Sequence, residues 1–227
     1  MTERVTDRLT EATGQTAQQA SQSAPQATKT THESPARPAV FLDRDGTICE
    51  EMGYLNHISR LHIFPFATAA VRRLNDAGLP VVVVTNQSGV SRGIFPESLI
   101  AEVHSRIQQA MAAAGARIEA FYYCTHTRAD DCQCRKPLPG LLQQAAREHN
   151  LLLPDSFVVG DRYADVELAH AVGGRGLLVL TGYGRGEYES RQHEWKRQPD
   201  DIVEDLSAAA DVIIRYLYKN SGEQARR

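Results

Sequence analysis

The sequence predicts an α/β fold, a Rossmann-like, doubly wound and mostly parallel sheet with helices on both faces. Short apolar runs alternate along the chain with amphipathic stretches of helical periodicity, which is the pattern of repeated strand and helix units. The apolar runs are rich in Val, Leu and aromatic residues, which favours strands that are buried on both faces. Polar residues follow the runs instead of interrupting them, as expected where ligands bind beyond the carboxyl ends of parallel strands.

Each element follows from one of these two patterns. Strands are predicted at the short apolar runs 39–42, 81–84, 120–123, 157–159 and 177–180. Helices are predicted where apolar residues recur at helical spacing, at 66–77, 97–114, 138–149 and 163–172. The polar stretch 184–200 is expected to be a loop. A last helix over 201–217 would dock one apolar stripe on the sheet, made of Ile202, Leu206, Ile213 and Leu217.

The ends of the chain differ from this folded domain, which we expect to span residues 39–220. Residues 1–38 contain no Phe, Tyr, Trp, Ile or Cys, and their charges cancel. Such a segment cannot bury enough apolar surface to offset its ordering entropy, so it is predicted to be a disordered tail. It lacks the apolar stretch of a secretory signal and the acid-poor composition of a transit peptide. Residues 221–227 are expected to form a short C-terminal tail.

Composition excludes several classes of protein. The chain has 227 residues, a net charge of −3 and 42% hydrophobic residues, which is normal for a globular protein. No apolar run approaches the ~20 residues that cross a bilayer, and the acidic balance argues against nucleic-acid binding. Four cysteines are too few for a disulfide framework and indicate a reducing compartment. We therefore expect a cytoplasmic monomer with no membrane or nucleic-acid partner.

The candidate catalytic and binding residues follow the predicted strands. Asp43-Arg44-Asp45-Gly46-Thr47 comes after the first strand, and Thr85-Asn86-Gln87-Ser88-Gly89 after the second. Gly160-Asp161-Arg162 follows the fourth strand, with Asp165 one helical turn later, and Arg135-Lys136-Pro137 precedes the helix at 138. Because the carboxyl ends of parallel strands meet at one edge of the sheet, these groups are predicted to converge.

These residue types fit phosphoryl transfer. Asp43 and Asp161, together with Asp45, can hold Mg²⁺, which prefers oxygen ligands. Asp43 can attack phosphorus as a carboxylate nucleophile, and Asp45 can serve as general acid and then as general base. Thr85 and Lys136 can neutralise the phosphoryl oxygens, and Gly46 allows a tight turn beneath the phosphate. A lone Asp-x-Asp is more often a cap or a turn, so it is the set of motifs at successive strand ends that favours catalysis.

This set, Asp43-x-Asp45-Gly46-Thr47, Thr85, Lys136 and Gly160-Asp161-x-x-x-Asp165, resembles the four motifs of the haloacid dehalogenase superfamily over about residues 39–184. The resemblance implies a haloacid dehalogenase-like fold and a phosphatase in which the first Asp forms an aspartyl-phosphate. It also implies that the second Asp is the proton donor and acceptor. Only residues 86–96 separate Thr85 from the next predicted helix, so we expect no large cap domain.

A second motif carries soft ligands. Cys124-Thr125-His126 and Cys132-Gln133-Cys134 bring three thiols and one imidazole into the loop 124–134, the composition of a closed structural zinc site. Arg135 and Lys136 follow this loop directly, so zinc bound there would hold both cations over the phosphate. Cys49 lies apart in the sequence and is expected to be a small apolar residue.

Within the superfamily, the chain resembles the zinc-loop branch of histidinol-phosphate and D-glycero-D-manno-heptose 1,7-bisphosphate phosphatases. Gly53-Tyr54, the stretch 88–93 and the stretch 134–140 favour the heptose type, which removes the 7-phosphate in the pathway to nucleotide-heptose and the lipopolysaccharide core. The short gap between His126 and Cys132 resembles the histidinol-phosphate type, which remains the alternative.

The resemblance implies a substrate site for a small sugar phosphate, in which the planar fork of Arg135 suits a second phosphate group. Besides Asp43, Asp45, Thr85 and Lys136, the implied substrate contacts are Arg44, Glu51, Met52, Gly53, Tyr54, Asn86, Gln87, Ser88, Arg135 and Arg162. Two other classes share part of this pattern. A phospho-accepting receiver module needs neither Asp45 nor a zinc loop, and a nucleic-acid 3′-phosphatase would favour a basic groove.

Overall fold

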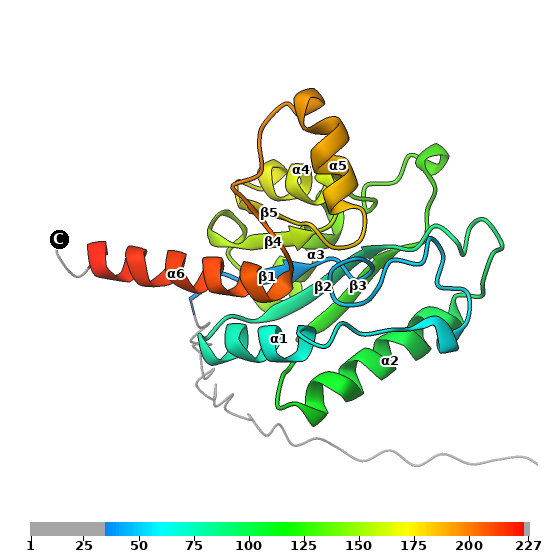
Figure 1. Cartoon of the computed structure of the whole chain (residues 1–227), viewed down its shortest axis with the longest axis horizontal. Coiled ribbons are helices and arrows are strands. Elements are labelled where there is room, and N and C mark those ends of the chain that lie inside the picture. The colour runs from blue at the N-terminus through cyan, green and yellow to red at the C-terminus, as the bar shows by residue number, and fades with distance from the viewer. Residues whose placement is uncertain (1–34, 225–227) are drawn as a thin grey trace, which may run out of the picture. The chain divides into compact units, whose positions relative to one another are not determined.

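The computed structural model describes residues 35–224 and contains one six-stranded parallel sheet with the order β3-β2-β1-β4-β5-β6 (Figure 1). The strands are β1 Val40–Leu42, β2 Val81–Asn86, β3 Ala120–Cys124, β4 Phe157–Gly160, β5 Arg175–Val179 and β6 Asp201–Val203. This is the strand order of Rossmann-type sheets. Successive strands are added on one side of β1 up to β3, and from β4 onward on the other side. The predicted fold class is confirmed, and the topological switch point lies between the two strands that precede Asp43 and Asp161.

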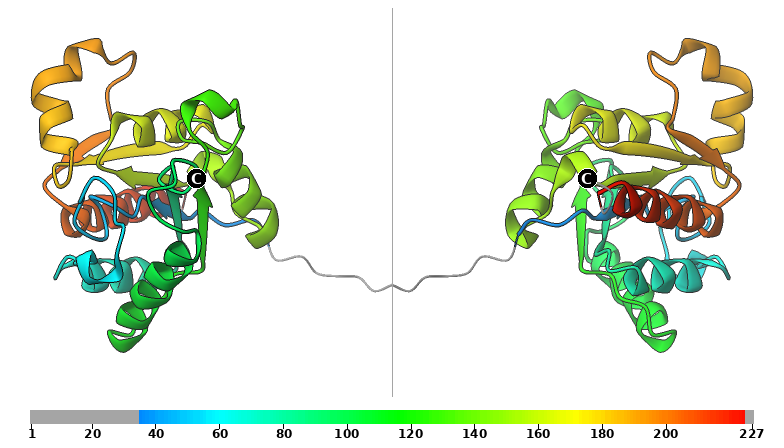
Figure 2. Two further views of the ribbon diagram at one scale, coloured as in Figure 1. Left: turned by 90° about the vertical axis from the view of Figure 1, so that its right-hand side faces the viewer. Right: turned by 90° about the vertical axis from the view of Figure 1, so that its left-hand side faces the viewer.

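Helices cover both faces of the sheet, as the turned views show (Figure 2). On one face, buried residues of α1 Ala67–Asp76, α2 Ser98–Ala113 and α6 Leu206–Gln224 share a core with the sheet. On the other face, α3 Gly140–His149 and α4 Tyr163–Ala171 form a second core. The strands supply both cores because successive side chains point to opposite faces, and every residue of β1 is completely buried.

Residues 184–200 are not the predicted loop. They contain α5 Gly184–Arg191 and a 3₁₀ turn at Gln192–Glu194. Only Gly184 of α5 is buried, so the helix has no apolar stripe from which periodicity could reveal it. Its surface carries ion pairs at helical spacing, such as Arg185 with Glu189 at 3.8 Å, which add modest support to an exposed helix.

The predicted helix over 201–217 was wrong at its start. Residues 201–203 form the edge strand β6, which pairs with β5, so Ile202 belongs to the sheet. The helix begins at Leu206, because the Asp205 carboxylate accepts a hydrogen bond from the Ala208 amide at 2.9 Å and caps it. Leu206 and Ile213 are buried as predicted, and Leu217 packs against the same core.

The folded part extends beyond the predicted domain boundaries. Arg37 forms a parallel bridge with Leu151, and its amide donates to the Asn150 carbonyl at 3.3 Å, so ordered chain precedes residue 39. At the other end, α6 continues to Gln224. The rest of the two predicted tails, residues 1–34 and 225–227, lies outside the described residues. Among residues 35–224, no helix is long and apolar enough to cross a membrane.

The turn after β1 depends on a glycine. Gly46 has φ +79°, and a Cβ at this position would lie 2.1 Å from the Asp161 Oδ2 atom. Gly78 has a similar φ of +82°, but a Cβ there would meet nothing within 4 Å. These two glycines therefore separate the cost of the backbone conformation from the cost of the close approach.

We expect Gly46→Ala to lower the free energy of unfolding more than Gly78→Ala. A Cβ at positive φ costs roughly 1–2 kcal/mol at either position, and overpacking against Asp161 adds about 1–3 kcal/mol at residue 46 alone. Urea denaturation of both variants measures the difference. Equal destabilisation would contradict the close packing of this turn on Asp161.

Candidate active site

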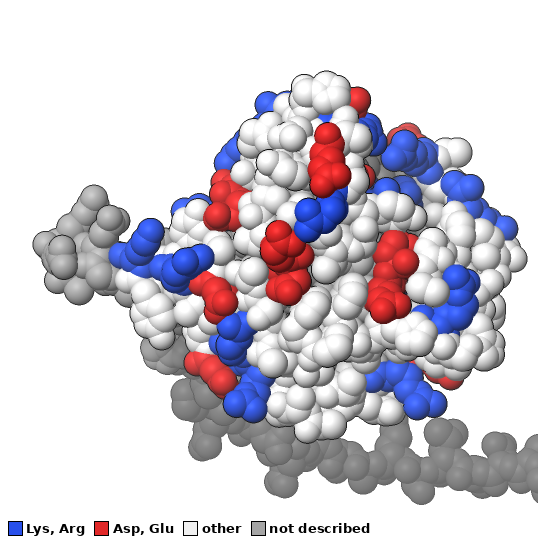
Figure 3. Space-filling view, in the orientation of Figure 1, with Lys and Arg blue, Asp and Glu red and all other residues white. Residues whose placement is uncertain are grey.

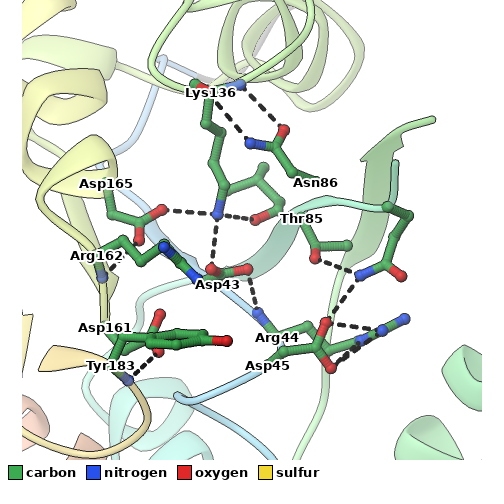
Figure 4. Close-up of polar contacts among 12 residues, drawn as sticks. Asp43, Arg44, Asp45, Thr85, Asn86, Lys136, Asp161, Arg162, Asp165 and Tyr183 are labelled. Atoms are coloured by element: carbon green, nitrogen blue, oxygen red, sulfur yellow. Dashed lines mark hydrogen bonds and ion pairs between the residues drawn. The ribbon is translucent and has the colours of Figure 1, made fainter. Parts of the chain in front are cut away.

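Two aspartates meet at the switch point of the sheet. Asp43 follows β1 and Asp161 follows β4, and these neighbouring strands are paired in register, Leu42 with Val159. Asp165 lies in the first turn of α4, and carboxylate oxygens of the three aspartates all lie within 4.8 Å of one another (Figure 4). The convergence predicted from the strand ends is therefore present.

Lys136 reaches this acidic group from the loop before α3. Its Nζ lies 2.9 Å from Asp43 Oδ2 and 2.7 Å from Asp165 Oδ1, and it donates a hydrogen bond to the Val84 carbonyl at 3.0 Å. Burial alone would lower the pKa of Lys136, but the charges of Asp165 and Asp43 outweigh burial and raise it above its ordinary value. The side chain therefore remains a buried ammonium.

One ammonium does not balance three buried carboxyl groups. Burial raises the pKa of Asp43 to about 6 despite the opposing charge of Lys136. Burial and then the charge of Asp43 raise the pKa of Asp161 to about 8. Asp161 Oδ2 accepts a hydrogen bond from the Tyr183 amide at 2.8 Å, whereas the buried Oδ1 has no hydrogen-bond partner among the described residues. This surplus of hard oxygen donors fits a site for Mg²⁺.

The structure does not bring the Asp45 carboxylate into this group, although Asp45 is one of the predicted magnesium ligands. Asp45 Oδ1 accepts hydrogen bonds from Nε and Nη2 of Arg44, both at 3.1 Å. Its Oδ2 accepts from Arg44 Nη2 and from Gln87 Nε2, both at 2.8 Å. The side chain is directed to these donors and still lines the adjacent cavity.

The residues at the carboxyl end of β2 and directly after it contact one another and the Lys136 loop. Gln87 Nε2 donates to Thr85 Oγ1 at 2.9 Å, which leaves the buried Thr85 hydroxyl proton available to another acceptor. Asn86 holds the backbone of Lys136 at both polar atoms, with its Oδ1 accepting from the amide at 3.1 Å and its Nδ2 donating to the carbonyl at 3.2 Å. Asn86 thus positions the Lys136 loop (Figure 4).

A cavity of about 620 Å³ opens beside these groups. It contains most of the predicted substrate contacts, namely Glu51, Gly53, Tyr54, Asn86, Gln87, Ser88, Arg135 and Arg162. Arg44 and Met52 do not line it, so these two predictions are not supported. Arg44 is buried with 1% exposure, and its guanidinium faces Asp45. The direction of a side chain within a tight turn cannot be read from a motif.

Some residues of the cavity wall were not predicted as substrate contacts. They include Arg92, Arg128, Asp131, Glu167 and Tyr183. The guanidinium of Arg162 stacks 3.8 Å from the centre of the Tyr183 ring and lies 3.6 Å from Glu187. Tyr183 follows β5, so the rule that ligands bind beyond strand ends points to it as well. Arg128 lies inside the Cys/His loop, and this position is the sequence feature that could have indicated its place in the cavity wall.

The four predicted soft ligands come together at the end of β3. Donor atoms of Cys124, His126, Cys132 and Cys134 lie within 4.8 Å of one another. Cys124 Sγ lies 2.9 Å from Cys134 Sγ, and His126 Nδ1 lies 3.2 Å from Cys134 Sγ, without a disulfide bond. Three thiols and one imidazole fit a closed four-coordinate zinc site. The cluster lies directly before Arg135, whose guanidinium donates to the His126 carbonyl at 2.9 Å.

Comparisons with known proteins agree with this site. A family model described as HAD-hydrolase-like matches residues 133–209, and one described as polynucleotide kinase 3 phosphatase matches residues 40–167, more than half of the chain. The D-glycero-D-manno-heptose-1,7-bisphosphate 7-phosphatase of Thermosynechococcus vestitus is 41% identical over 193 residues, which cover 80% of this chain and 97% of that protein. The D-glycero-beta-D-manno-heptose-1,7-bisphosphate 7-phosphatase of Pseudomonas aeruginosa is 36% identical over 79% of this chain and 99% of its own length.

The same similarity holds in three dimensions. A crystal structure of the D,D-heptose 1,7-bisphosphate phosphatase of B. bronchiseptica, complexed with magnesium and phosphate, matches with a TM-score of 0.72 and 31% identity. The match covers 79% of this chain and 99% of that one. Fold and site together define a phosphatase of the haloacid dehalogenase-like hydrolases. Within this class, the chain belongs to the family of D-glycero-D-manno-heptose-1,7-bisphosphate 7-phosphatases.

The raised pKa values predict how Mg²⁺ affects stability. Between the ordinary value of 3.8 and about 8, the folded protein holds more protons on Asp161 than the unfolded chain. Stability of the magnesium-free protein therefore falls as pH rises through this window. A cation at the carboxylates offsets that loss, so Mg²⁺ should raise the melting temperature more at pH 8 than at pH 5. Thermal unfolding of dialysed protein with and without MgCl₂ measures both shifts.

Asp161→Asn provides the control for this experiment, because it removes a carboxylate and keeps the shape of the side chain. The variant should lose most of the extra stabilisation at pH 8. An equal rise of the melting temperature at both pH values in the unmodified protein would contradict the electrostatic account.

Proposed function

We propose that this phosphatase removes the 7-phosphate of D-glycero-D-manno-heptose 1,7-bisphosphate, as a step toward nucleotide-heptose and the lipopolysaccharide core. The observation that carries the proposal is the pairing of the Asp43, Lys136 and Asp161 centre with the Cys/His loop in a chain 41% identical to a phosphatase of that substrate. The relatives favour this substrate over histidinol phosphate, the alternative that the gap between His126 and Cys132 raised.

In the first half of the reaction, an Asp43 carboxylate oxygen attacks phosphorus and the bond from phosphorus to the sugar oxygen breaks. Asp45 gives its proton to the departing sugar oxygen, because an alkoxide is a poor leaving group. The Lys136 ammonium and the Thr85 hydroxyl bind the equatorial phosphoryl oxygens, where negative charge is spread in the transition state. The products are the sugar with a free hydroxyl group in place of that phosphate and an aspartyl-phosphate on Asp43.

In the second half, a water molecule attacks phosphorus on the aspartyl-phosphate. Asp45, now a carboxylate, takes the proton of that water, and the bond from phosphorus to the Asp43 oxygen breaks. Inorganic phosphate leaves and the Asp43 carboxylate is restored. The proton that Asp45 lost in the first half is thereby replaced, so the site returns to its starting state.

Two metal ions complete this proposal. Asp43 and Asp161, with Asp165 beside them, would hold Mg²⁺, which neutralises the carboxylates and allows a phosphate dianion to approach. Cys124, His126, Cys132 and Cys134 would hold Zn²⁺, because soft thiolates favour zinc and hard oxygens favour magnesium. The zinc ligands stiffen the loop that carries Arg135 and Lys136 into the cavity.

The cavity wall supports a substrate with two anionic groups. Lys136 serves the reacting phosphate, while four arginines also line the cavity, namely Arg92, Arg128, Arg135 and Arg162. The family model described as polynucleotide kinase 3 phosphatase also matches residues 40–167. A net charge of −3 does not favour a nucleic-acid substrate, and on the face shown in Figure 3 acidic and basic side chains are interspersed.

Phosphate release tests the substrate and the nucleophile together. The purified protein with Mg²⁺ should hydrolyse the heptose bisphosphate with higher kcat/KM than histidinol phosphate or a 3′-phosphorylated oligonucleotide. Asp43→Asn should lower kcat by about 10³-fold or more, roughly 4 kcal/mol of barrier, because it removes the nucleophilic oxygen. Asp76→Asn, an equivalent change at an exposed position on α1, should leave kcat unchanged. Retention of a tenth of the activity in Asp43→Asn would exclude Asp43 as nucleophile.

Metal content tests the zinc loop. The purified protein should contain one Zn²⁺ per chain, and Cys132→Ser should lose it and show lower activity, because the Lys136 loop loosens. Cys49→Ser should keep its zinc, since Cys49 lies outside the cluster. Elemental analysis by mass spectrometry gives the stoichiometry. Full activity in a protein without zinc would rule out the proposed clamp.

Substrate choice tests Arg135. Arg135→Ala should lower kcat/KM for the heptose bisphosphate by about 10- to 150-fold, the loss of one charge-assisted contact of roughly 1.5–3 kcal/mol. A small aryl phosphate should be affected much less, because it has no second phosphate for Arg135 to bind. Paired kinetics on the two substrates measure the ratio, and a uniform loss would argue against recognition by Arg135.

A further inference from the structure

Arg44 stands between the nucleophile and the proton donor in the sequence, but it does not reach the substrate cavity. Its side chain is 2% exposed, and the residues that line the cavity do not include it. A buried guanidinium is costly unless it is paired and hydrogen-bonded, so packing alone does not account for an arginine at this position. The groups that Arg44 contacts indicate its function.

Arg44 contacts both catalytic carboxylates. Its backbone amide donates to Asp43 Oδ1 at 2.6 Å. Its guanidinium forks onto Asp45, with Nε and Nη2 on Oδ1 at 3.1 Å each and Nη2 on Oδ2 at 2.8 Å. Its own carbonyl accepts from the amides of Ile48 at 2.9 Å and Cys49 at 3.1 Å, which fixes the turn. One residue thus orients the nucleophile through its backbone and the acid/base through its side chain.

Gln87 completes the binding site for the Asp45 carboxylate. Its amide nitrogen donates to Asp45 Oδ2 at 2.8 Å and to Thr85 Oγ1 at 2.9 Å. Both oxygens of Asp45 are therefore engaged as acceptors, in a plane set by the rigid fork of Arg44. A lysine carries the same charge but cannot form this fork, so geometry and charge can be separated by substitution.

We propose that Arg44 is a positioning residue for proton transfer by Asp45. The Arg44 fork fixes the plane of the Asp45 carboxylate at the wall of the cavity, where Asp45 meets the leaving sugar oxygen and later the attacking water. This inference rests on the acid/base role proposed above for Asp45. It assigns to Arg44 a function distinct from the substrate contact that the motif resemblance implies.

The leaving group of the substrate distinguishes this role from others. Arg44→Lys should lower kcat/KM for an alkyl phosphate such as a sugar phosphate by about 30- to 100-fold, since a misplaced acid loses much of the 10²–10⁴ that proton transfer contributes. The kcat/KM for p-nitrophenyl phosphate should stay within about threefold, because that leaving group needs little protonation. A rise in KM for the sugar bisphosphate with unchanged kcat would instead identify a substrate contact and overturn the proposal.

The same measurements distinguish this positioning role from a merely structural role of Arg44. If Arg44→Lys acted through loss of fold, both substrates would be affected equally and the melting temperature and zinc content would fall. Arg73→Lys serves as the matched control, because Arg73 on α1 is also paired with an aspartate, Asp211, but lies outside the site. That variant should leave both substrates unaffected. Equal losses on both substrates in Arg44→Lys would overturn the proposal.

A double-mutant cycle gives the decisive measurement. In an Asp45→Asn background, Arg44→Lys should change alkyl phosphate turnover by less than about threefold, because Arg44 acts through Asp45. Multiplicative losses would overturn the proposal. The cycle can be run on any alkyl phosphate that the protein hydrolyses. Failure of the heptose assignment would appear in the substrate panel, whereas failure of the Arg44 proposal would appear only in the coupling.

Discussion

The buried ammonium of Lys136, held between Asp43 and Asp165 at 2.9 and 2.7 Å, is the interaction on which the rest of the site depends. It joins three parts of the chain: the end of β1, the first turn of α4 and the loop before α3. Removing one partner of such a buried pair leaves an uncompensated charge, which typically costs about 3–5 kcal/mol.

The loop that carries Lys136 links the Cys/His cluster to the carboxylate cluster. Asn86 binds both polar backbone atoms of Lys136, and Cys134 precedes it by two residues in the Cys/His cluster. The soft-ligand cluster and the hard-oxygen cluster are therefore chemically separate but mechanically connected. The surplus of carboxylates over cations lowers the stability of the folded protein, since burial and repulsion between carboxylates raise the pKa values of Asp43 and Asp161.

Strong periodicity and parallel register made much of this structure predictable. The strands β1 to β5 and helices α1 to α4 follow from apolar spacing, and the meeting of Asp43 with Asp161 follows from neighbouring parallel strands. The helix α5 lacks an apolar stripe and β6 is three residues long, so neither gives a periodic signal. The direction of Arg44 and Asp45 depends on rotamers inside a turn, which spacing does not determine.

The cavity is lined by loops that follow the strands and by α4, whereas Asp43, Thr85 and Asp161 are buried at the ends of the strands. In the described part of the chain, only residues 87–97 connect β2 to α2, so no domain is inserted between these two elements. Exchange of wall residues such as Arg92 or Arg128 leaves the hydrophobic core intact. Substitutions in this wall can therefore change the shape and charge of the cavity at little cost in stability.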